Sequence, residues 1–185
     1  VPALSRADTL ALVEQIDSAA DGLRIFAESA GNPLFTIELA RSRATEEESV
    51  PSTLAELVRD RIARLPPDAE DLLRWSAVLG PSFAVQRLSA LDVQEASDLL
   101  RSLDVIERHG LIRATGENDL YRFAHDLVHR VVYADLSAPR RRLMHRRVAQ
   151  LLERQGSSEQ SVVADLAHHA ALAGDAALAA QACVA

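Results

Sequence analysis

Apolar residues recur at helical spacing through most of this 185-residue chain. In the first third they predict four short helices, over residues 7–20, 23–30, 34–44 and 53–65. The last has the clearest apolar stripe, formed by Leu54, Leu57, Val58, Ile62 and Leu65. After the boundary "PPD", further helices are predicted over 68–80, 85–91 and 92–110, the last capped by Asp92 and ended by Gly110.

Helical spacing gives way to strand-like alternation between residues 111 and 124. The segments "LIRAT" and "LYRFA", separated by the turn "GEND", predict a two-stranded hairpin, and a helix follows it. Three helices and then a hairpin is the order of a winged helix. Beyond Pro139 the pattern is helical again, and "LAGDAALAAQA" has the small-residue turn of a helical-hairpin repeat similar to a tetratricopeptide repeat (TPR). The predicted fold class is therefore mainly α.

Composition and the ends of the sequence indicate where in the cell the protein is expected. Hydrophobic residues make up 48% of the chain, but no apolar run approaches the roughly 18 residues that cross a bilayer. The N-terminus lacks a signal-peptide profile, and Cys183 is the single cysteine, so a cytoplasmic location is expected. The chain starts without methionine and ends in an alanine-rich helical pattern, and we interpret it as a piece of a longer protein.

The absence of lysine excludes two kinds of chemistry. All 20 basic residues are arginine, so the chain has neither a GxxxxGK[ST] phosphate loop nor a Schiff-base lysine. Its serines and histidines lack a nucleophile elbow, and no carboxylate pair is distinguished. The segment is not expected to be an enzyme by itself.

Three stretches, in this order, resemble one family: "GNPLFTIELARS" (31–42), "VPSTLAELVRDRIARLPPDAEDLLRWSAVLG" (50–80) and "YRFAHDLVHRVVYADLSAPRRRLMHRRVAQLLE" (121–153). Together they resemble the segment after the ATPase core of STAND-class signal-transduction ATPases. The match is closest to the large ATP-dependent LuxR-type transcriptional regulators. In that family a P-loop domain binds and slowly hydrolyses ATP, a helical lid and a winged helix close over the nucleotide, and helical repeats contact signals or partners.

The resemblance implies a domain organisation. Residues 1–66 would be the helical lid, 67–137 the winged helix with its small β-hairpin, and 138–185 the start of the TPR-like repeats. ATP or ADP would bind the parent protein, with none bound to this segment alone. Its partners would be an upstream P-loop domain and downstream repeats of the same chain, with self-association on activation. DNA would be contacted only by a domain after Ala185, and a membrane is not expected.

The first candidate site is the turn formed by Gly31, Asn32 and Pro33. A glycine with positive φ can end one helix, an asparagine can cap the next, and a proline suits its first turn. These roles are a sufficient structural explanation. The resemblance implies a further role, in which Pro33, with Asn32 beside it, lies against the adenine of a bound nucleotide.

The second candidate is the pair His125 and Asp126, where strand pattern meets helix pattern. His125 and His129 have the i, i+4 spacing of a zinc pair, but a third ligand would have to come from another segment. A structural interpretation is a partly buried histidine with Asp126 near a helix N-terminus. The resemblance implies instead that "AHDLV" matches a Met-His-Asp motif, with Ala124 in place of methionine. In that motif the histidine donates a hydrogen bond to the diphosphate of ADP.

Charge weighs against DNA binding by the winged helix. Residues 67–137 hold seven arginines and twelve acidic residues, a net charge of −5, and the presumed recognition helix at 92–109 is acidic. One basic cluster follows, in "PRRRLMHRRV", formed by Arg140, Arg141, Arg142, Arg146 and Arg147. It can be the solvated face of a helix whose other side carries Leu143, Met144, Val148 and Leu151. It can also be an interaction patch for nucleic acid, a partner or the acidic residues Glu46, Glu47 and Glu48.

The sequence therefore favours a regulatory segment that couples the nucleotide state of an upstream domain to the helical repeats. Two alternatives remain open, a free-standing DNA-binding winged-helix regulator and a helical interaction scaffold that contacts no nucleotide.

Overall fold

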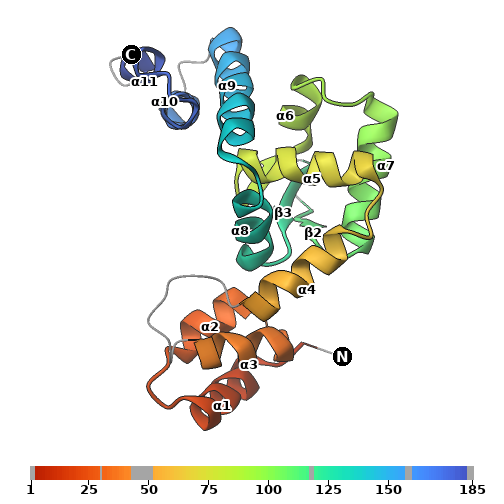
Figure 1. Cartoon of the computed structure of the whole chain (residues 1–185), viewed down its shortest axis with the longest axis vertical. Coiled ribbons are helices and arrows are strands. Elements are labelled where there is room, and N and C mark those ends of the chain that lie inside the picture. Colours follow the sequence, from red (N-terminus) through yellow and green to blue (C-terminus); the bar gives the residue numbers. More distant parts are fainter. Residues whose placement is uncertain (1–2, 30, 43–51, 117–118, 157–159, 183–185) are drawn as a thin grey trace.

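The protein folds into a chain of helices around one small sheet, as a computed structural model describes it (Figure 1). The structure describes residues 3–29, 31–42, 52–116, 119–156 and 160–182. The predicted fold class, mainly α, is confirmed. The acidic cluster Glu46, Glu47 and Glu48, and also Cys183, lie outside the described residues.

The first three helices form a bundle of their own. They are α1 (Arg6–Ile16), α2 (Gly22–Ser29) and α3 (Pro33–Ser42), and each packs against the other two. Their shared core is small, with Val13, Ile25 and Ala40 at its centre. The side chain of Ser5 caps α1 by accepting a hydrogen bond from the Asp8 amide at 3.2 Å.

Helix α4 (Ser52–Ile62) connects this bundle to the rest of the molecule (Figure 1). Leu54 and Val58 are buried in the same cluster as Phe35 of α3 and the core of the winged helix. The predicted apolar stripe is wrong for Leu57, which is 40% exposed. Leu57 is exposed because it faces the pocket described below rather than the core.

The winged helix is built from α5 (Pro67–Leu79), α6 (Val85–Ala90) and α7 (Ala96–Arg108) around an antiparallel sheet. The sheet has three strands in the order β1-β3-β2, namely β1 (Ser82–Ala84), β2 (Ile112–Ala114) and β3 (Leu120–Phe123). The prediction of a two-stranded hairpin was therefore incomplete, because β1 pairs with the other side of β3.

The predicted cap of the third helix is also corrected. Helix α7 starts at Ala96 with Glu95 at the N-cap position, and no side chain caps it. Asp92 lies before it with a left-handed backbone, at a φ of 51°. This conformation suits a turn, which aspartate tolerates better than most residues.

The last four helices are α8 (Asp126–Ala134), α9 (Ala138–Gln155), α10 (Gln160–Ala173) and α11 (Ala176–Ala182). Helix α9 packs against both α5 and α10, and α10 packs against α11. Figure 1 shows α9 between the winged helix and the pair α10 and α11. No helix in the described ranges is both long enough and apolar enough to cross a bilayer.

A buried polar chain joins α8, α9 and α10. The Tyr133 hydroxyl lies 2.8 Å from Nε2 of His145, and Nδ1 of His145 lies 2.7 Å from Nδ1 of His169. His145 and His169 are only 1% and 3% exposed. One Nδ1 must therefore carry a proton and donate a hydrogen bond to the other, so the two rings cannot both be fully protonated.

Candidate functional site

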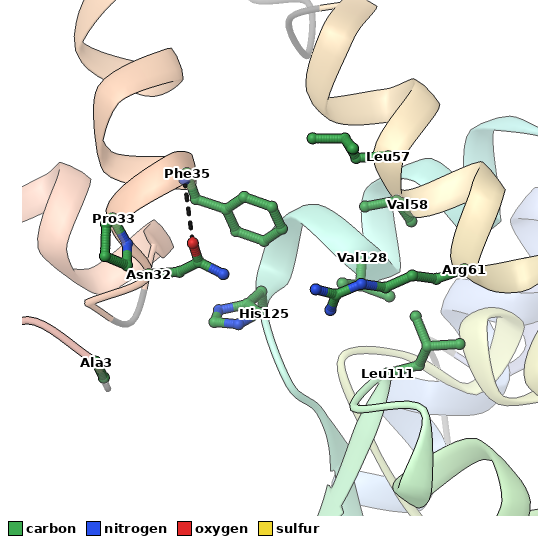
Figure 2. Close-up of a pocket in the computed structure, with 10 residues that line it drawn as sticks. All are labelled: Ala3, Asn32, Pro33, Phe35, Leu57, Val58, Arg61, Leu111, His125 and Val128. Carbon is green, nitrogen blue, oxygen red and sulfur yellow. Dashed lines mark hydrogen bonds between the residues drawn. The ribbon is translucent and has the colours of Figure 1, made fainter. Parts of the chain in front are cut away.

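A pocket of about 420 Å³ lies where the N-terminal bundle meets the winged helix. Its walls come from segments distant in sequence, as Figure 2 shows: the start of α3, one face of α4, the start of α8 and the residue before β2. The lining residues are Ala3, Asn32, Pro33, Phe35, Leu57, Val58, Arg61, Leu111, His125 and Val128. This volume is in the range of small-molecule sites.

One wall is the turn that the sequence singled out. Gly31 has a φ of 75°, and a Cβ at this position would lie 2.4 Å from the carbonyl oxygen of Leu4. The Asn32 side chain accepts a hydrogen bond from the Phe35 amide at 3.4 Å, as an N-cap does. Pro33 is the first residue of α3. The predicted structural roles of all three residues are thus observed.

Polar contacts beneath the turn hold it in place. The Thr36 hydroxyl donates to the Asn32 carbonyl oxygen at 3.0 Å and lies 3.1 Å from the hydroxyl of Ser29. Both side chains are fully buried. The turn therefore presents Asn32 and Pro33 to the pocket from a rigid base.

The opposite wall carries His125. It is the N-cap residue of α8, with an extended backbone, and its carbonyl oxygen accepts the Val128 amide at 3.0 Å. Its ring meets the ring of Phe35 edge-on, with centroids 5.2 Å apart. Nδ1 of His125 is shielded from solvent, and none of the described residues offers it a hydrogen bond. Buried polar atoms without a partner are rare and costly, so this nitrogen could form a hydrogen bond with a ligand in the pocket.

The electrostatic setting keeps His125 neutral. Burial lowers the pKa of His125, and the positive charges of Arg113 and Arg61 lower the same pKa further. A neutral imidazole offers one N–H donor and one acceptor, so it can donate to an anionic oxygen without carrying charge itself.

The structure thus places three of the four predicted residues, Asn32, Pro33 and His125, around one pocket, although more than 90 positions separate the first from the last. The fourth, Asp126, is exposed in the first turn of α8 and does not line the pocket. The sequence analysis missed Arg61, which lines the pocket from α4. Its i+3 spacing from Val58, a predicted core position, could have placed it at the edge of the apolar stripe.

The positions of His125 and His129 do not favour their interpretation as a zinc pair. His125 precedes the first turn of α8, while Nε2 of His129 donates to the carbonyl oxygen of Ala77 at 2.9 Å. Within the described ranges no three His, Cys, Asp or Glu side chains are grouped to hold a metal ion.

The arginine cluster of α9 divides into two parts. Arg140 pairs with Asp71, Arg141 lies 5.3 Å from the ring centre of Tyr133, and Arg147 donates to the carbonyl oxygen of Leu91 at 2.6 Å. Arg140 and Arg147 attach α9 to the winged helix, and Arg141 attaches it to α8. Arg142 and Arg146 instead border a surface hollow beside Leu143. The expected burial of Leu143 is wrong, because its side chain is 66% exposed.

Comparison with known proteins bears on the fold alone. No model of a known protein family matches the chain, and no curated protein matches it. Among solved structures, the fold is similar to that of a STAND protein with a tetratricopeptide repeat sensor from Pyrococcus horikoshii, at a TM-score of 0.58 and 16% identity. The match covers 98% of this chain and 26% of that one, so the chain spans about a quarter of its length. The fold is therefore STAND-like.

Proposed function

We propose that this chain is the regulatory segment of a STAND-type ATPase, and that its pocket closes over a nucleotide held by an upstream P-loop domain. The adenine would lie against Pro33, and neutral His125 would donate a hydrogen bond to the diphosphate of ADP. Exchange of ADP for ATP would release the winged helix and allow the repeats to rearrange. A contact made with one nucleotide state and lost in the other is what biases a two-state switch.

The observation that carries this proposal is the shared pocket of Pro33 and His125. The wall around Pro33 and Phe35 is apolar and suits a planar ring, while His125 and Arg61 supply polar groups on the other side. The STAND-like fold supports the same assignment at the level of architecture. Within this class we propose the ATP-dependent LuxR-type regulators, on the strength of the three sequence stretches given above.

Calorimetric titration of the parent protein with ADP tests the proposal. Replacing His125 with alanine removes a hydrogen bond to a charged group, so we expect ADP affinity to fall about tenfold or more. His168 is exposed and distant in sequence, and His168→Ala serves as the matched control. Equal ADP affinity in the wild type and the His125→Ala variant would leave a helical scaffold as the better interpretation.

DNA binding by the winged helix itself is less well supported. The exposed charges of α7 alternate in sign, and Arg101 pairs with Asp98 at 3.0 Å. A helix in the major groove needs a basic face to neutralise phosphates. A gel shift that is tight and weakens steeply with salt would reverse this preference.

A further inference from the structure

A bidentate ion pair joins helix α4 to helix α8. Nε of Arg59 donates to one carboxylate oxygen of Asp135 and Nη2 donates to the other, each at 2.8 Å. The two residues are 76 positions apart, and Asp135 is the C-cap residue of α8. Two parallel hydrogen bonds of this kind fix the relative orientation of two groups as well as their distance.

The ion pair lies on the side of α4 that faces away from the pocket. Leu57 and Arg61 line the pocket from α4 (Figure 2). Arg59 is two residues from each of them, and at about 100° per residue its side chain leaves the helix on the opposite side. Val58 lies between the two sides and is buried in the core that α4 shares with α8.

The pocket and the ion pair are also separated along α8. His125 precedes the first turn of α8 and lines the pocket, while Asp135 follows the last turn. The nine residues of α8 between them span about 14 Å. Val131 and Val132 belong to the same buried cluster as Val58 of α4. The two helices therefore meet through an apolar centre, with the pocket on one side of it and the ion pair on the other.

This arrangement makes the α4 wall of the pocket depend on the ion pair. An apolar contact has no preferred direction, so it fixes the tilt of α4 less strictly than two parallel hydrogen bonds do. A tilt of α4 about the apolar centre would move Leu57 and Arg61 relative to His125. These residues form facing walls of the pocket, so such a tilt would open or close it.

We propose that Arg59 and Asp135 are a positioning pair whose ion pair holds α4 at the tilt that closes the pocket. The proposal rests on the proposed function only for the role of the pocket, because the position of α4 can be measured without a nucleotide. The two side chains are 50% and 40% exposed, so salt screens their attraction. Exposed ion pairs are weak, and one of them shifts a two-state equilibrium by about two- to fivefold. A contact of this strength favours the closed pocket and still allows it to open.

Pulsed electron resonance on this chain tests the positioning pair. Spin labels on Glu56→Cys in α4 and Ser89→Cys in α6, both exposed, in a background with Cys183 replaced by serine, report the position of α4 relative to the winged helix. We expect a major and a minor distance in this background. The minor population should be about two- to fivefold larger in Arg59→Gln and in Asp135→Asn.

A charge swap and a local ion pair supply the controls. The double variant Arg59→Glu with Asp135→Arg allows the ion pair to form with its charges reversed, so it should recover most of the major population. Arg101→Gln removes an ion pair with Asp98 at 3.0 Å, which lies within α7 and joins no two helices. The distances in Arg101→Gln should equal those of the labelled background.

Salt gives a second readout, which a loss of packing would not change. Raising the salt concentration from about 0.05 M to about 0.5 M screens exposed charges more strongly. The minor population should therefore grow in the labelled background and in the charge-swapped variant, and stay constant in Arg59→Gln.

Two results would overturn the positioning pair. The populations in Arg59→Gln could equal those in Arg101→Gln, or the charge-swapped variant could be as disturbed as the single variants. Circular dichroism checks that each variant folds. If an Asp135 variant does not fold, Arg59→Gln and its salt dependence carry the test, because the Arg59 side chain is exposed.

Failure of the positioning pair differs from failure of the proposed function. In the parent protein the pair should slow ADP release, so Arg59→Gln should release ADP about two- to fivefold faster. If ADP binding depends on His125 but neither the distances nor ADP release respond to Arg59→Gln, the positioning pair is wrong and the nucleotide switch stands. If the distances respond in this chain but the parent protein binds no ADP, the positioning pair stands and the proposed function is wrong.

Discussion

At the scale of single residues, the half-buried His125 and the buried pair His145 and His169 have different consequences. His125 lines an open pocket, and one of its nitrogens has no described partner. His145 and His169 instead satisfy each other between α9 and α10. The first arrangement leaves a hydrogen bond available to a ligand, whereas the second uses it to hold helices together.

The pair His145 and His169 predicts a loss of stability in acid. Burial lowers the pKa of both rings to about 4, and the neighbouring charges of His168, Arg141 and Arg87 act in the same direction. Asp165, which pairs with Arg87, opposes this for His169. Since an unfolded histidine has a pKa near 6.5, the unfolded state binds more protons between pH 6.5 and 4. The free energy of unfolding should fall as the pH is lowered through that window and level off below it.

Urea unfolding at a series of pH values measures this effect. The His169→Asn variant keeps a polar atom near the position of Nδ1 but removes one titrating group, so its pH dependence should be flatter than that of the wild type. His168→Asn removes only one of the neighbouring charges that lower these two pKa values, so its slope should lie between those of the wild type and His169→Asn. Parallel curves for the wild type and His169→Asn would mean that these rings do not set the acid stability.

Single site residues could be predicted where the sequence pattern changes around them, and not where it is regular. Asn32, Pro33 and His125 stand at breaks in the pattern, where a turn or a change of period makes a residue conspicuous. Arg61 lies within a regular helix among other arginines, and its sequence neighbours do not show that it faces a pocket. Leu143 has a helical position that fits the buried stripe, yet the neighbouring helices leave it exposed.

At the scale of elements, the turn before α3 supports the pocket wall. Gly31→Ala should destabilise the N-terminal bundle, because it combines a positive φ with a Cβ 2.4 Å from a backbone oxygen. Strain of this kind costs about 1–3 kcal/mol, and the clash adds to it. Hydrogen exchange of the amides in α1, α2 and α3 would measure the loss.

Gly156→Ala provides the control for that variant. Gly156 also has a positive φ, of 59°, but a Cβ there would meet nothing within 4 Å. Gly156→Ala should lower the free energy of unfolding by only about 1 kcal/mol, because alanine disfavours the left-handed backbone conformation. If Gly31→Ala were no more disruptive than Gly156→Ala, the close approach of Leu4 would not constrain the turn.

Helix α9 is the element that connects the winged helix to the repeats. Arg147 donates to the Leu91 carbonyl oxygen and lies 5.7 Å from the centre of the Trp75 ring. Arg147→Ala should therefore lower the free energy of unfolding by about 1–2 kcal/mol and change Trp75 fluorescence. Arg142→Ala, on the exposed side of the same helix, should stay within about 0.5 kcal/mol of the wild type. Equal effects of the two substitutions would contradict the attachment.

The elements themselves were mostly predictable because helical periodicity is a long-range signal in the sequence. Strand β1 has only three residues, Ser82 to Ala84, too few to show alternation, and its pairing with β3 depends on residues nearly 40 positions away. Asp92 resembled a cap, but the left-handed turn moved the start of α7 to Ala96. Residue types indicate which positions could cap a helix, but tertiary packing decides at which of them the helix starts.

At the scale of the whole molecule, the cores form a continuous path from the pocket to the repeats. Phe35, Leu54 and Val58 share one cluster with the winged helix, and a second cluster joins Val78 of α5 to Met144 and Val148 of α9. Trp75 and Leu79 pack against both clusters. A shift of α4 against α8 can therefore reach α9 through α5, since tightly packed interiors transmit displacement. The sequence predicted the order of the parts, but the way their cores merge depends on long-range packing that periodicity does not show.

The central claim is that the pocket between the bundle and the winged helix opens when ADP is exchanged for ATP. Spin labels on Leu23→Cys in α2 and Leu100→Cys in α7, both exposed positions, in a background with Cys183 replaced by serine, would report the distance between the two parts in the parent protein by pulsed electron resonance. The account predicts one narrow distance distribution with ADP, a longer and broader one with ATP, and an ATP-like distribution for His125→Ala even with ADP. Identical distributions with both nucleotides and in the variant would contradict it.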